Sequence, residues 1–239
     1  MAAESGPCSW HAGENAILAA LPPDERRRLE PLLEPVEVER GRLYHARGEP
    51  IEHAYFPIDG LFSLLSVPEE GRSVEVGAVG RPGFTGLAVL FEDEAPAFDA
   101  IGQVAGRAWR IRAEDLRTEL ARGGHLRRLL LRFAQAQMTQ VGQTAACNRL
   151  HEIDQRTARW LLHCADWVGR ERFELTQEFL AYMLAVRRPS VTTAAALMQR
   201  AGFITYHRGV IAILDRAGLE GATCECYAII RNEYRRLVG

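Results

Sequence analysis

The sequence predicts an α+β protein in which an N-terminal jelly-roll β-barrel, a long dimerisation helix and a C-terminal winged helix–turn–helix follow one another. Three observations predict this order. Short alternating runs fill residues 36–111, one uninterrupted helical pattern fills residues 125–150, and two helical runs followed by a hairpin fill residues 176–214. Alternation of apolar and polar residues is typical of strands, whereas apolar residues three and four apart are typical of helices.

The barrel is expected within residues 14–122, where it would act as a sensor. A helical region broken by Pro22-Pro23 comes first. The alternating runs that follow are separated by turn residues at Gly41, Gly48, Gly60 and Gly106. Seven or eight short strands spaced in this way are typical of a jelly roll. A short helix that ends at Gly123-Gly124 follows the last strand.

Residues 124–150 are expected to form a helix that joins two copies of the chain. One stripe of this helix follows spacings of four and three through Leu126, Leu130, Phe133, Gln137, Val141 and Thr144. This is the spacing of a coiled-coil seam, and it predicts a homodimer. The alternative is a helix that packs on its own barrel.

The C-terminal domain, residues 151–239, contains the predicted helix–turn–helix. Thr176 is suited to capping the first helix. Pro189 fits the first turn of a second helix and not the interior of the first, so the second helix is expected from Pro189 to about Arg200. Gly202 ends it, and a hairpin with Arg208 at its tip follows.

Charge indicates what this domain binds. No acidic residue occurs between Glu178 and Asp215, and all 29 basic residues of the chain are arginines. From Arg149 onward the chain holds 13 arginines and 10 acidic residues, although the net charge of the whole chain is −2. This pattern favours double-stranded DNA as the partner. The residues predicted to contact it are Thr176, Arg187, Arg188, Ser190, Thr192, Thr193 and Arg208. The alternative is an ordinary helical hairpin with a solvated arginine pair.

Several classes of function are excluded by what the sequence lacks. No apolar run is long enough to span a membrane, and the N-terminus has no signal peptide, which favours the cytoplasm. No catalytic constellation is found, so an enzyme is not expected. The spacing of four glycines does not match a nucleotide-binding loop, and they are expected to serve turns: Gly77, Gly80, Gly83 and Gly86.

No cofactor or metal is expected either. The five cysteines are odd in number and irregularly spaced, so they indicate no disulfide framework. Cys224 and Cys226 fall in a stretch that is expected to form one amphipathic helix. Residues two apart on a helix point to different sides, which argues against joint chelation by these two thiols.

The order of barrel, long helix and winged helix–turn–helix resembles the Crp/Fnr superfamily of bacterial transcription regulators. The resemblance covers about residues 16–214 and rests on the long helix and on three stretches, "YFPIDGLFSLL", "VGRPGFTG" and above all "LTQEFLAYMLAVRRPSVTTAAALMQRAGFI". It implies a barrel of the cyclic-nucleotide-binding type, a homodimer and pseudo-palindromic promoter sites. It also implies RNA polymerase as a partner if the protein is an activator.

Two known effectors do not fit the residues present. Members that bind cyclic nucleotides carry a Gly-Glu-Leu and an Arg-Ser/Thr-Ala, whereas this chain has Thr85 near the Glu position and Phe98-Asp99-Ala100 near the Arg position. The pocket is therefore expected to be degenerate, and cyclic AMP is not expected to bind. Its predicted residues are Gly83, Thr85, Gly86, Phe98 and Asp99. Cys8 is the one cysteine before Cys147, so an N-terminal iron–sulfur cluster is not expected.

The second helix also departs from the family. Members commonly have Arg-Glu-Thr/Ser-Val-x-Arg at its start, where the Glu and the second Arg contact bases. Here Arg188 keeps the first Arg, but Pro189 replaces the Glu and Thr193 replaces the second Arg. We therefore expect fewer base contacts per half-site than in relatives, or different ones. The alternative for the whole chain is a sensing scaffold whose C-terminal module binds protein instead of DNA.

Overall fold

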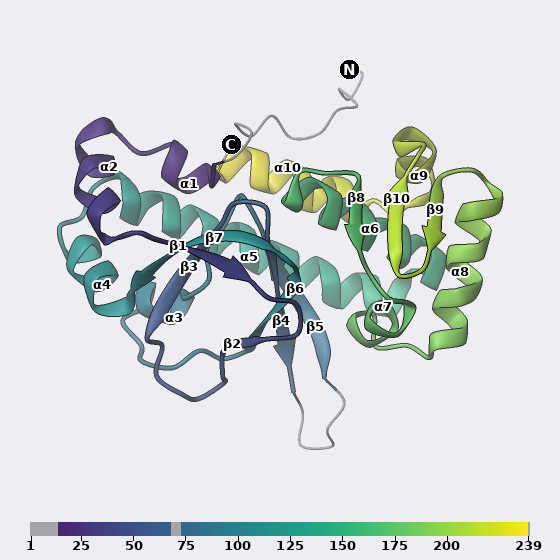
Figure 1. Ribbon diagram of the computed structural model, residues 1–239, viewed down its shortest axis with the longest axis horizontal. Helices are drawn as coiled ribbons and strands as arrows, with labels where there is room; N and C mark the ends of the chain where they lie inside the picture. Colours follow the sequence, from purple (N-terminus) through teal and green to yellow (C-terminus); the bar gives the residue numbers. More distant parts are fainter. Residues whose placement is uncertain (1–13, 68–72, 239) are drawn as a thin grey trace.

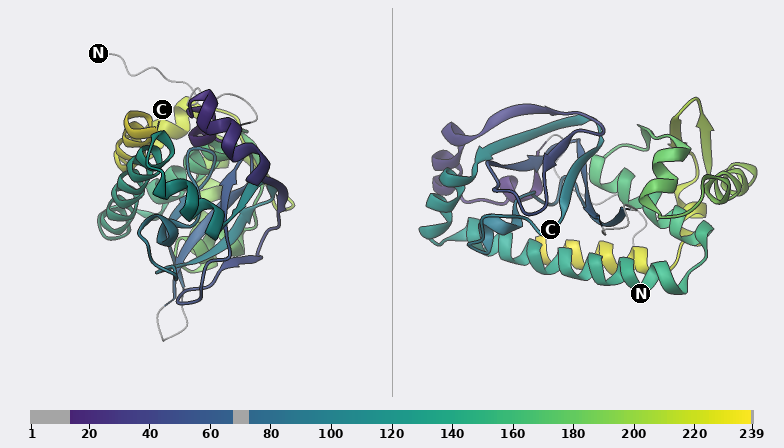
Figure 2. Two further views of the ribbon diagram at one scale, coloured as in Figure 1. Left: turned by 90° about the vertical axis from the view of Figure 1, so that its left-hand side faces the viewer. Right: turned by 90° about the horizontal axis from the view of Figure 1, so that it is seen from below.

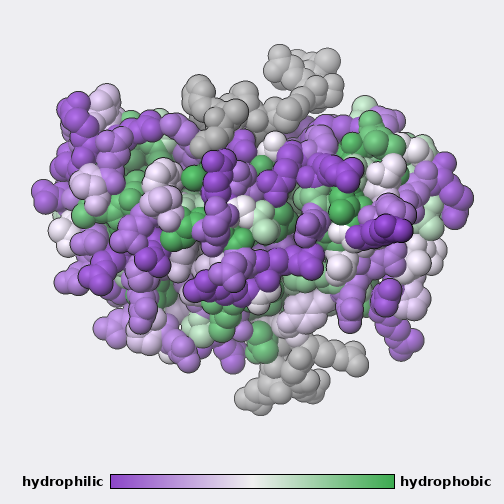
Figure 3. All heavy atoms as spheres, in the orientation of Figure 1, coloured by the Kyte–Doolittle hydropathy of each residue, from purple (hydrophilic) through white to green (hydrophobic). Residues whose placement is uncertain are grey.

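The computed structural model describes residues 14–67 and 73–238, and Cys8 lies outside these ranges. It confirms the predicted α+β fold, with a β-rich region and a mainly helical region that one long helix joins (Figure 1). On the face shown in Figure 3, hydrophilic side chains cover much of the surface and hydrophobic ones lie between them in small patches. None of the helices in the described ranges is both long and apolar enough to span a membrane.

The barrel is made of two antiparallel sheets. One has the order β1 (Glu34–Val38), β7 (Gly106–Arg112), β3 (His53–Pro57), and the other has the order β2 (Leu43–His45), β6 (Asp99–Val104), β4 (Leu61–Ser66), β5 (Val74–Val79). The hydrophobic core includes fully buried side chains from these strands, such as Phe56, Phe62 and Ile111. Short helices surround the barrel: α1 (Ala16–Ala19), α2 (Pro23–Leu29), the 3₁₀ turn Glu30–Leu32, α3 (Leu87–Leu90) and α4 (Ala113–Ala121).

The long helix α5 (His125–Leu150) packs on its own barrel. Leu126, Leu130, Phe133, Gln137 and Thr144 are all buried within the chain, while Val141 is half-buried. The Phe133 ring lies 5.5 Å from that of Phe84 and 6.1 Å from that of Tyr234. The prediction that this stripe forms a dimer seam is therefore wrong, because barrel and C-terminal side chains already cover it.

Three glycines allow helices to approach the barrel closely. A Cβ atom on Gly77 would lie 2.6 Å from the Gln137 amide, and one on Gly83 would lie 2.2 Å from the Phe133 ring. A Cβ atom on Gly80 would lie 2.4 Å from Trp167 in the C-terminal domain. Gly80 and Gly83 also form a turn, as predicted, because the Gly83 amide donates to the Gly80 carbonyl at 2.9 Å. Gly77 lies within β5 and not in a turn, so the prediction is wrong for Gly77.

The C-terminal domain contains α6 (Ile153–Val168), β8 (Arg172–Glu174), α7 (Gln177–Met183), α8 (Arg188–Arg200), β9 (Ile204–His207), β10 (Val210–Ile213), α9 (Arg216–Ala222) and α10 (Cys226–Val238). The wing is a sheet with the order β8-β10-β9. Figure 2 shows that α10 turns back and lies along α5. The last helix is thus shared between the two regions of the molecule.

Buried polar contacts join the barrel to the C-terminal domain. The Trp160 indole N–H on α6 donates to the Glu75 carboxylate on β5 at 2.8 Å. The Arg81 guanidinium donates to the backbone carbonyls of Ile58, at 2.9 Å, and of Val168, at 3.2 Å. Because these groups are removed from water, their partners fix how the two regions meet.

Candidate functional site

The helix–turn–helix begins at Thr176, whose side chain caps α7 by accepting a hydrogen bond from the Phe179 amide at 3.1 Å. Ala185, in the turn between the two helices, has a φ of 52°. The second helix, α8, begins at Arg188, one residue before the predicted start, with Pro189 in its first turn and Arg187 at its N-cap. Proline is accepted there because its missing N–H has no partner at this end of a helix.

The outer face of α8 presents most of the predicted DNA-contacting residues. Arg187, Arg188, Thr192 and Thr193 are exposed, and Ser190 is half-buried. The Thr193 hydroxyl donates to the Pro189 carbonyl at 3.1 Å. The Thr192 hydroxyl lies 2.7 Å from the Gln177 side-chain oxygen and 3.0 Å from the Arg188 carbonyl. Because a hydroxyl has one proton, these threonines keep acceptor positions for a donor from outside. Figure 1 shows α8 at the edge of the molecule, remote from the barrel.

The tip of the wing lies beside the start of α8. Arg208 and Gly209 connect β9 to β10 with φ values of 49° and 76°, as a two-residue type I′ hairpin requires. Arg208 is exposed. A surface hollow brings together residues from α7, α8 and the wing: Thr176, Gln177, Arg188, Tyr206, Arg208 and Gly209. Two cations that are 20 positions apart in the sequence thus line one depression.

The cations of this surface lack counter-ions in the part of the chain that the structure describes. Within the described ranges, Arg187, Arg188, Arg200 and Arg208 form no ion pair. Arg216, in the same domain, is paired with acidic residues on three sides: Asp166, Glu171 and Glu220. The surface formed by α8 and the wing tip is therefore suited to a polyanion. That its residues contact DNA stays a prediction.

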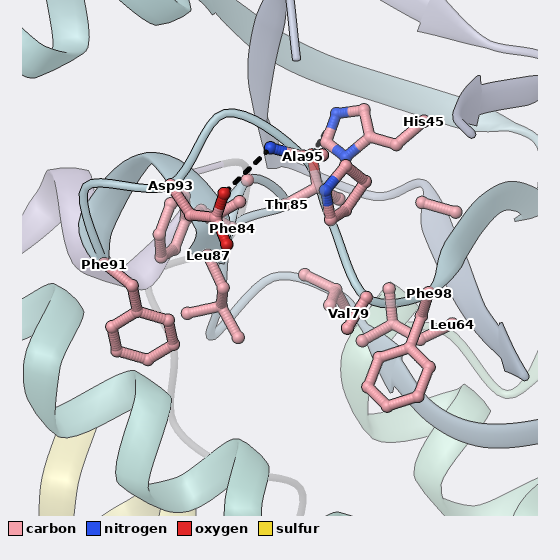
Figure 4. A pocket seen from close by; sticks show the side chains of 15 residues that line it. His45, Leu64, Val79, Phe84, Thr85, Leu87, Phe91, Asp93, Ala95 and Phe98 are labelled. Carbon is pink, nitrogen blue, oxygen red and sulfur yellow. Dashed lines mark hydrogen bonds between the residues drawn. The ribbon is translucent and has the colours of Figure 1, made fainter. Parts of the chain in front are cut away.

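The barrel contains a second candidate site, an apolar cavity of about 310 Å³ (Figure 4). The residues that line it are His45, Leu64, Val79, Phe84, Thr85, Gly86, Leu87, Ala88, Phe91, Asp93, Ala95, Pro96, Ala97, Phe98 and Ala100. It lies at the position that the sequence predicts for a degenerate effector pocket. The lining contains no arginine, so a phosphate there would find no cation to pair with.

Few polar groups face this cavity. Burial lowers the pKa of His45 to about 4, so its ring is neutral at pH 7. One ring nitrogen of His45 lies 2.9 Å from the His53 carbonyl. The Thr85 hydroxyl accepts a hydrogen bond from the Tyr55 amide at 3.1 Å. The Asp93 carboxylate accepts hydrogen bonds from the backbone amides of Glu94 and Ala95, and Figure 4 shows the one from Ala95. The site is suited to a mainly apolar ligand.

Two of the predicted pocket residues lie elsewhere. Gly83 faces Phe133 on α5 instead of the cavity. The Asp99 carboxylate accepts a hydrogen bond from the Arg47 amide at 2.7 Å and does not line the cavity. Of the predicted residues, Thr85, Gly86 and Phe98 line the cavity, together with three that were not predicted: Leu87, Phe91 and Asp93. Those three belong to α3 and the loop after it, whose path the residue pattern does not define. That Thr85, Gly86 and Phe98 bind an effector stays a prediction.

The prediction of one continuous C-terminal helix is also wrong. Helix α9 ends at Ala222 and α10 begins at Cys226, so the chain changes direction around Cys224. The two thiols consequently do not point to different sides. Together with Cys147 and His151 they form a cluster whose ligand atoms all lie within 4.8 Å of one another.

Comparison with known proteins agrees with both halves of the fold. Residues 35–122 match the cyclic nucleotide-binding domain family, and residues 155–222 match the Crp-like helix-turn-helix domain family. The chain belongs to the Crp/Fnr superfamily of transcription regulators. A relative of this Crp/Fnr protein in Mycobacterium tuberculosis is named "CRP-like cAMP-activated global transcriptional regulator". It is 24% identical over 206 residues, which cover 83% of this chain and 92% of the relative.

Solved structures share the same fold as this Crp/Fnr regulator. FixK2 from Bradyrhizobium japonicum has a TM-score of 0.68 at 13% identity, with 80% of this chain and 98% of that chain covered. A transcriptional regulator of the Crp/Fnr family from Eubacterium rectale has a TM-score of 0.64 at 18% identity, with 87% and 99% covered. The matches extend across both the barrel and the helix–turn–helix, so they support the whole predicted order of domains.

Proposed function

We propose that this Crp/Fnr regulator binds double-stranded promoter DNA as a cytoplasmic homodimer, with α8 in the major groove and the wing tip on the phosphate backbone. Arg188 and Arg208, which form no ion pair among residues 14–67 and 73–238, converge on one hollow at the start of α8, and this convergence supports the proposal. A helix start, two cations and free hydroxyl acceptors together provide the contacts that position a protein on a duplex.

The residues of α8 support fewer contacts with base edges than relatives make. Pro189 has no side-chain donor or acceptor, and Thr193 uses its proton on the Pro189 carbonyl. Neither can make the bidentate contact to guanine that arginine makes. We therefore propose that specificity depends on Arg187, Arg188 and the shape of the DNA.

The test is Arg188→Ala, with Arg117→Ala as the matched control. Arg117 is an exposed arginine on α4, at the barrel end of the molecule, so both variants lose one charge. If Arg188 contacts phosphate, its loss weakens binding to all sequences and lowers the slope of log affinity against log salt by about one. If it contacts guanine, the loss is about 1–3 kcal/mol and confined to sites with that base.

Fluorescence anisotropy on matched and mismatched operators at several salt concentrations distinguishes these results. Arg117→Ala should bind like the unaltered protein. Equal affinities of Arg188→Ala, Arg187→Ala and the unaltered protein for every DNA would contradict the proposed recognition helix. The remaining alternative would then be a C-terminal module that binds protein.

The effector, if the barrel binds one, is proposed to be a mainly apolar molecule and not cyclic AMP. The lining of the cavity has no arginine, and its one imidazole is neutral at pH 7. Calorimetry with cyclic AMP should show no binding at micromolar concentrations. Micromolar affinity would mean that backbone amides bind the phosphate. RNA polymerase is proposed as a partner only if the protein activates transcription.

A further inference from the structure

We infer that Cys147, His151, Cys224 and Cys226 form a binding site for a single Zn²⁺ ion. The Sγ atoms of Cys147 and Cys224 lie 3.5 Å apart, and the Cys226 Sγ lies 3.6 Å from the His151 Nδ1. A tetrahedral zinc ion with Zn–S distances of about 2.3 Å and a Zn–N distance of about 2.0 Å places neighbouring ligand atoms about 3.5–3.8 Å apart. The observed separations fit this arrangement.

The histidine is oriented as a metal ligand. Its Nδ1 faces Cys226, and its Nε2 lies 3.3 Å from the Glu225 carboxylate. A hydrogen bond from Nε2–H to that carboxylate would leave the Nδ1 lone pair free to bind the ion. Histidine ligands in proteins commonly have such a carboxylate partner, which fixes the ring and increases its basicity.

The surroundings are suited to an anionic complex. Three thiolates and one Zn²⁺ carry a net charge of −1, and all three cysteines are buried. On the adjacent helix α6, Arg156 and Arg159 are buried and interact electrostatically with Cys147. Neither has an ion-pair partner among residues 14–67 and 73–238, and the Nε of each has no hydrogen-bond partner. A buried cation without a close counter-ion is unfavourable, and the zinc complex would add a negative charge beside both arginines, of which Arg159 also interacts electrostatically with Glu75.

The distances within the cluster favour a single metal ion over an iron–sulfur cluster or a disulfide. Four ligand atoms within 4.8 Å surround a single centre, whereas an iron–sulfur cluster would hold them further apart. The 3.5 Å separation of Cys147 and Cys224 is a nonbonded distance, compared with about 2.05 Å in a disulfide. Three cysteines with one histidine form a ligand set of structural zinc sites.

The position of the site indicates what the ion would do. Cys147 and His151 come from the C-terminal end of α5, while Cys224 and Cys226 come from the segment between α9 and α10. The ion would tie this segment to the long helix and so hold α10 along α5. Because α5 also packs on the barrel, bound zinc would fix the position of the C-terminal domain relative to the barrel.

The first experiment measures metal in the reduced, full-length protein. Elemental analysis should find about one zinc per chain. Replacement by Co²⁺ should produce the thiolate charge-transfer and d–d absorption of a tetrahedral site. Cys147→Ser and Cys226→Ser should each lose the ion or bind it far more weakly. Cys164→Ser, which removes a buried cysteine outside the cluster, should keep full stoichiometry.

Glu225→Gln provides a test that does not depend on a buried substitution. The Glu225 side chain is 69% exposed, so the change should not affect folding. Loss of the partner of His151 should weaken zinc affinity roughly 10–100-fold, in proportion with other outer-shell carboxylates. Competition with a chromophoric chelator measures this change. These readouts need no DNA, so they succeed or fail independently of the proposed function.

Three results would overturn the inference. One is reduced protein that binds no Co²⁺ with thiolate absorption. Another is unchanged zinc affinity in Cys147→Ser and Cys226→Ser. The third is a Cys147–Cys224 disulfide, found by mass spectrometry, in protein kept under reducing conditions.

Discussion

At the scale of the residue, Arg208 combines an unfavourable backbone conformation with an exposed cation. Its φ of 49° lies in the left-handed region, which costs a residue other than glycine roughly 1–2 kcal/mol and asparagine less. Asn-Gly is the preferred pair for this type of turn. An arginine at this position therefore makes the wing less stable, and its proposed contact with phosphate gives a reason for it.

Arg208→Asn should consequently separate stability from binding. We expect the free energy of unfolding to rise by roughly 0.5–1 kcal/mol, since asparagine adopts this φ more easily. DNA affinity should fall for all sequences, with a salt slope lower by about one. Chemical denaturation and anisotropy measure the two effects. A variant that binds DNA as well as the unaltered protein would remove Arg208 from the interface.

At the scale of the element, α5 has two faces with different roles. One face is covered by side chains of the barrel and of the C-terminal domain. An outer stripe remains exposed, formed by Leu131, Gln135, Met138, Gly142 and Ala145. Their spacing of four and three is that of a helix pair. Leu131 is 45% exposed and Met138 is 73% exposed, and no atom lies within 4 Å of a Cβ built on Gly142. We propose that this outer stripe forms the homodimer contact.

Met138→Glu should convert the dimer to a monomer while the chain stays folded, because a charge would be buried at the contact. Met138→Leu is the control and should remain dimeric. Phe133→Asp should instead destabilise the chain itself, since Phe133 is fully buried against the barrel. Sedimentation and thermal denaturation distinguish the two. A Met138→Glu variant that sediments as a dimer would place the interface elsewhere.

The elements differ in how far the sequence alone could predict them. Helix α8 was predictable because Pro189 and Gly202 mark its ends, and the turn at Arg208-Gly209 because glycine favours a positive φ. Strand β8 was missed because three residues give no periodicity and become a strand only by pairing with β10. Spacing along α5 predicts an apolar face but not which partner covers it. The cysteine cluster was missed because its members come together only through the break between α9 and α10.

At the scale of the whole molecule, a buried carboxylate lies where the sensor meets the DNA-binding domain. Burial raises the pKa of Glu75 from 4.5 to about 7, although hydrogen bonds from Ser63 and Trp160 and the charge of Arg159 oppose this. The Ser63 hydroxyl lies 2.6 Å from Glu75 and 2.8 Å from the Gln103 side-chain oxygen. One hydroxyl proton cannot serve both oxygens, whereas a protonated Glu75 could donate to Ser63 and leave that proton for Gln103.

The stability of this junction should therefore depend on pH. Because its pKa is raised, Glu75 binds its proton more tightly in the folded state than in the unfolded state. Its contribution to the free energy of unfolding is therefore largest below pH 4.5 and falls as the pH rises towards 7. Between these two pH values the contribution of Glu75 to the free energy of unfolding changes by roughly 3 kcal/mol. Glu75→Gln should raise the melting temperature at pH 8, have little effect at pH 5 and flatten the profile between them. Parallel pH profiles for the two proteins would contradict this assignment.

Genome-wide mapping of bound DNA in the source cell would show whether the start of α8 recognises promoter DNA. The unaltered protein should occupy discrete promoter sites that share an inverted repeat, because a two-fold dimer presents two copies of α8 to the duplex. The Arg187→Ala/Arg188→Ala variant, expressed at the same level, should lose these sites. Recognition of promoters by α8 would be wrong if the unaltered protein enriched no shared sequence, or if the double variant kept the same sites at the same occupancy.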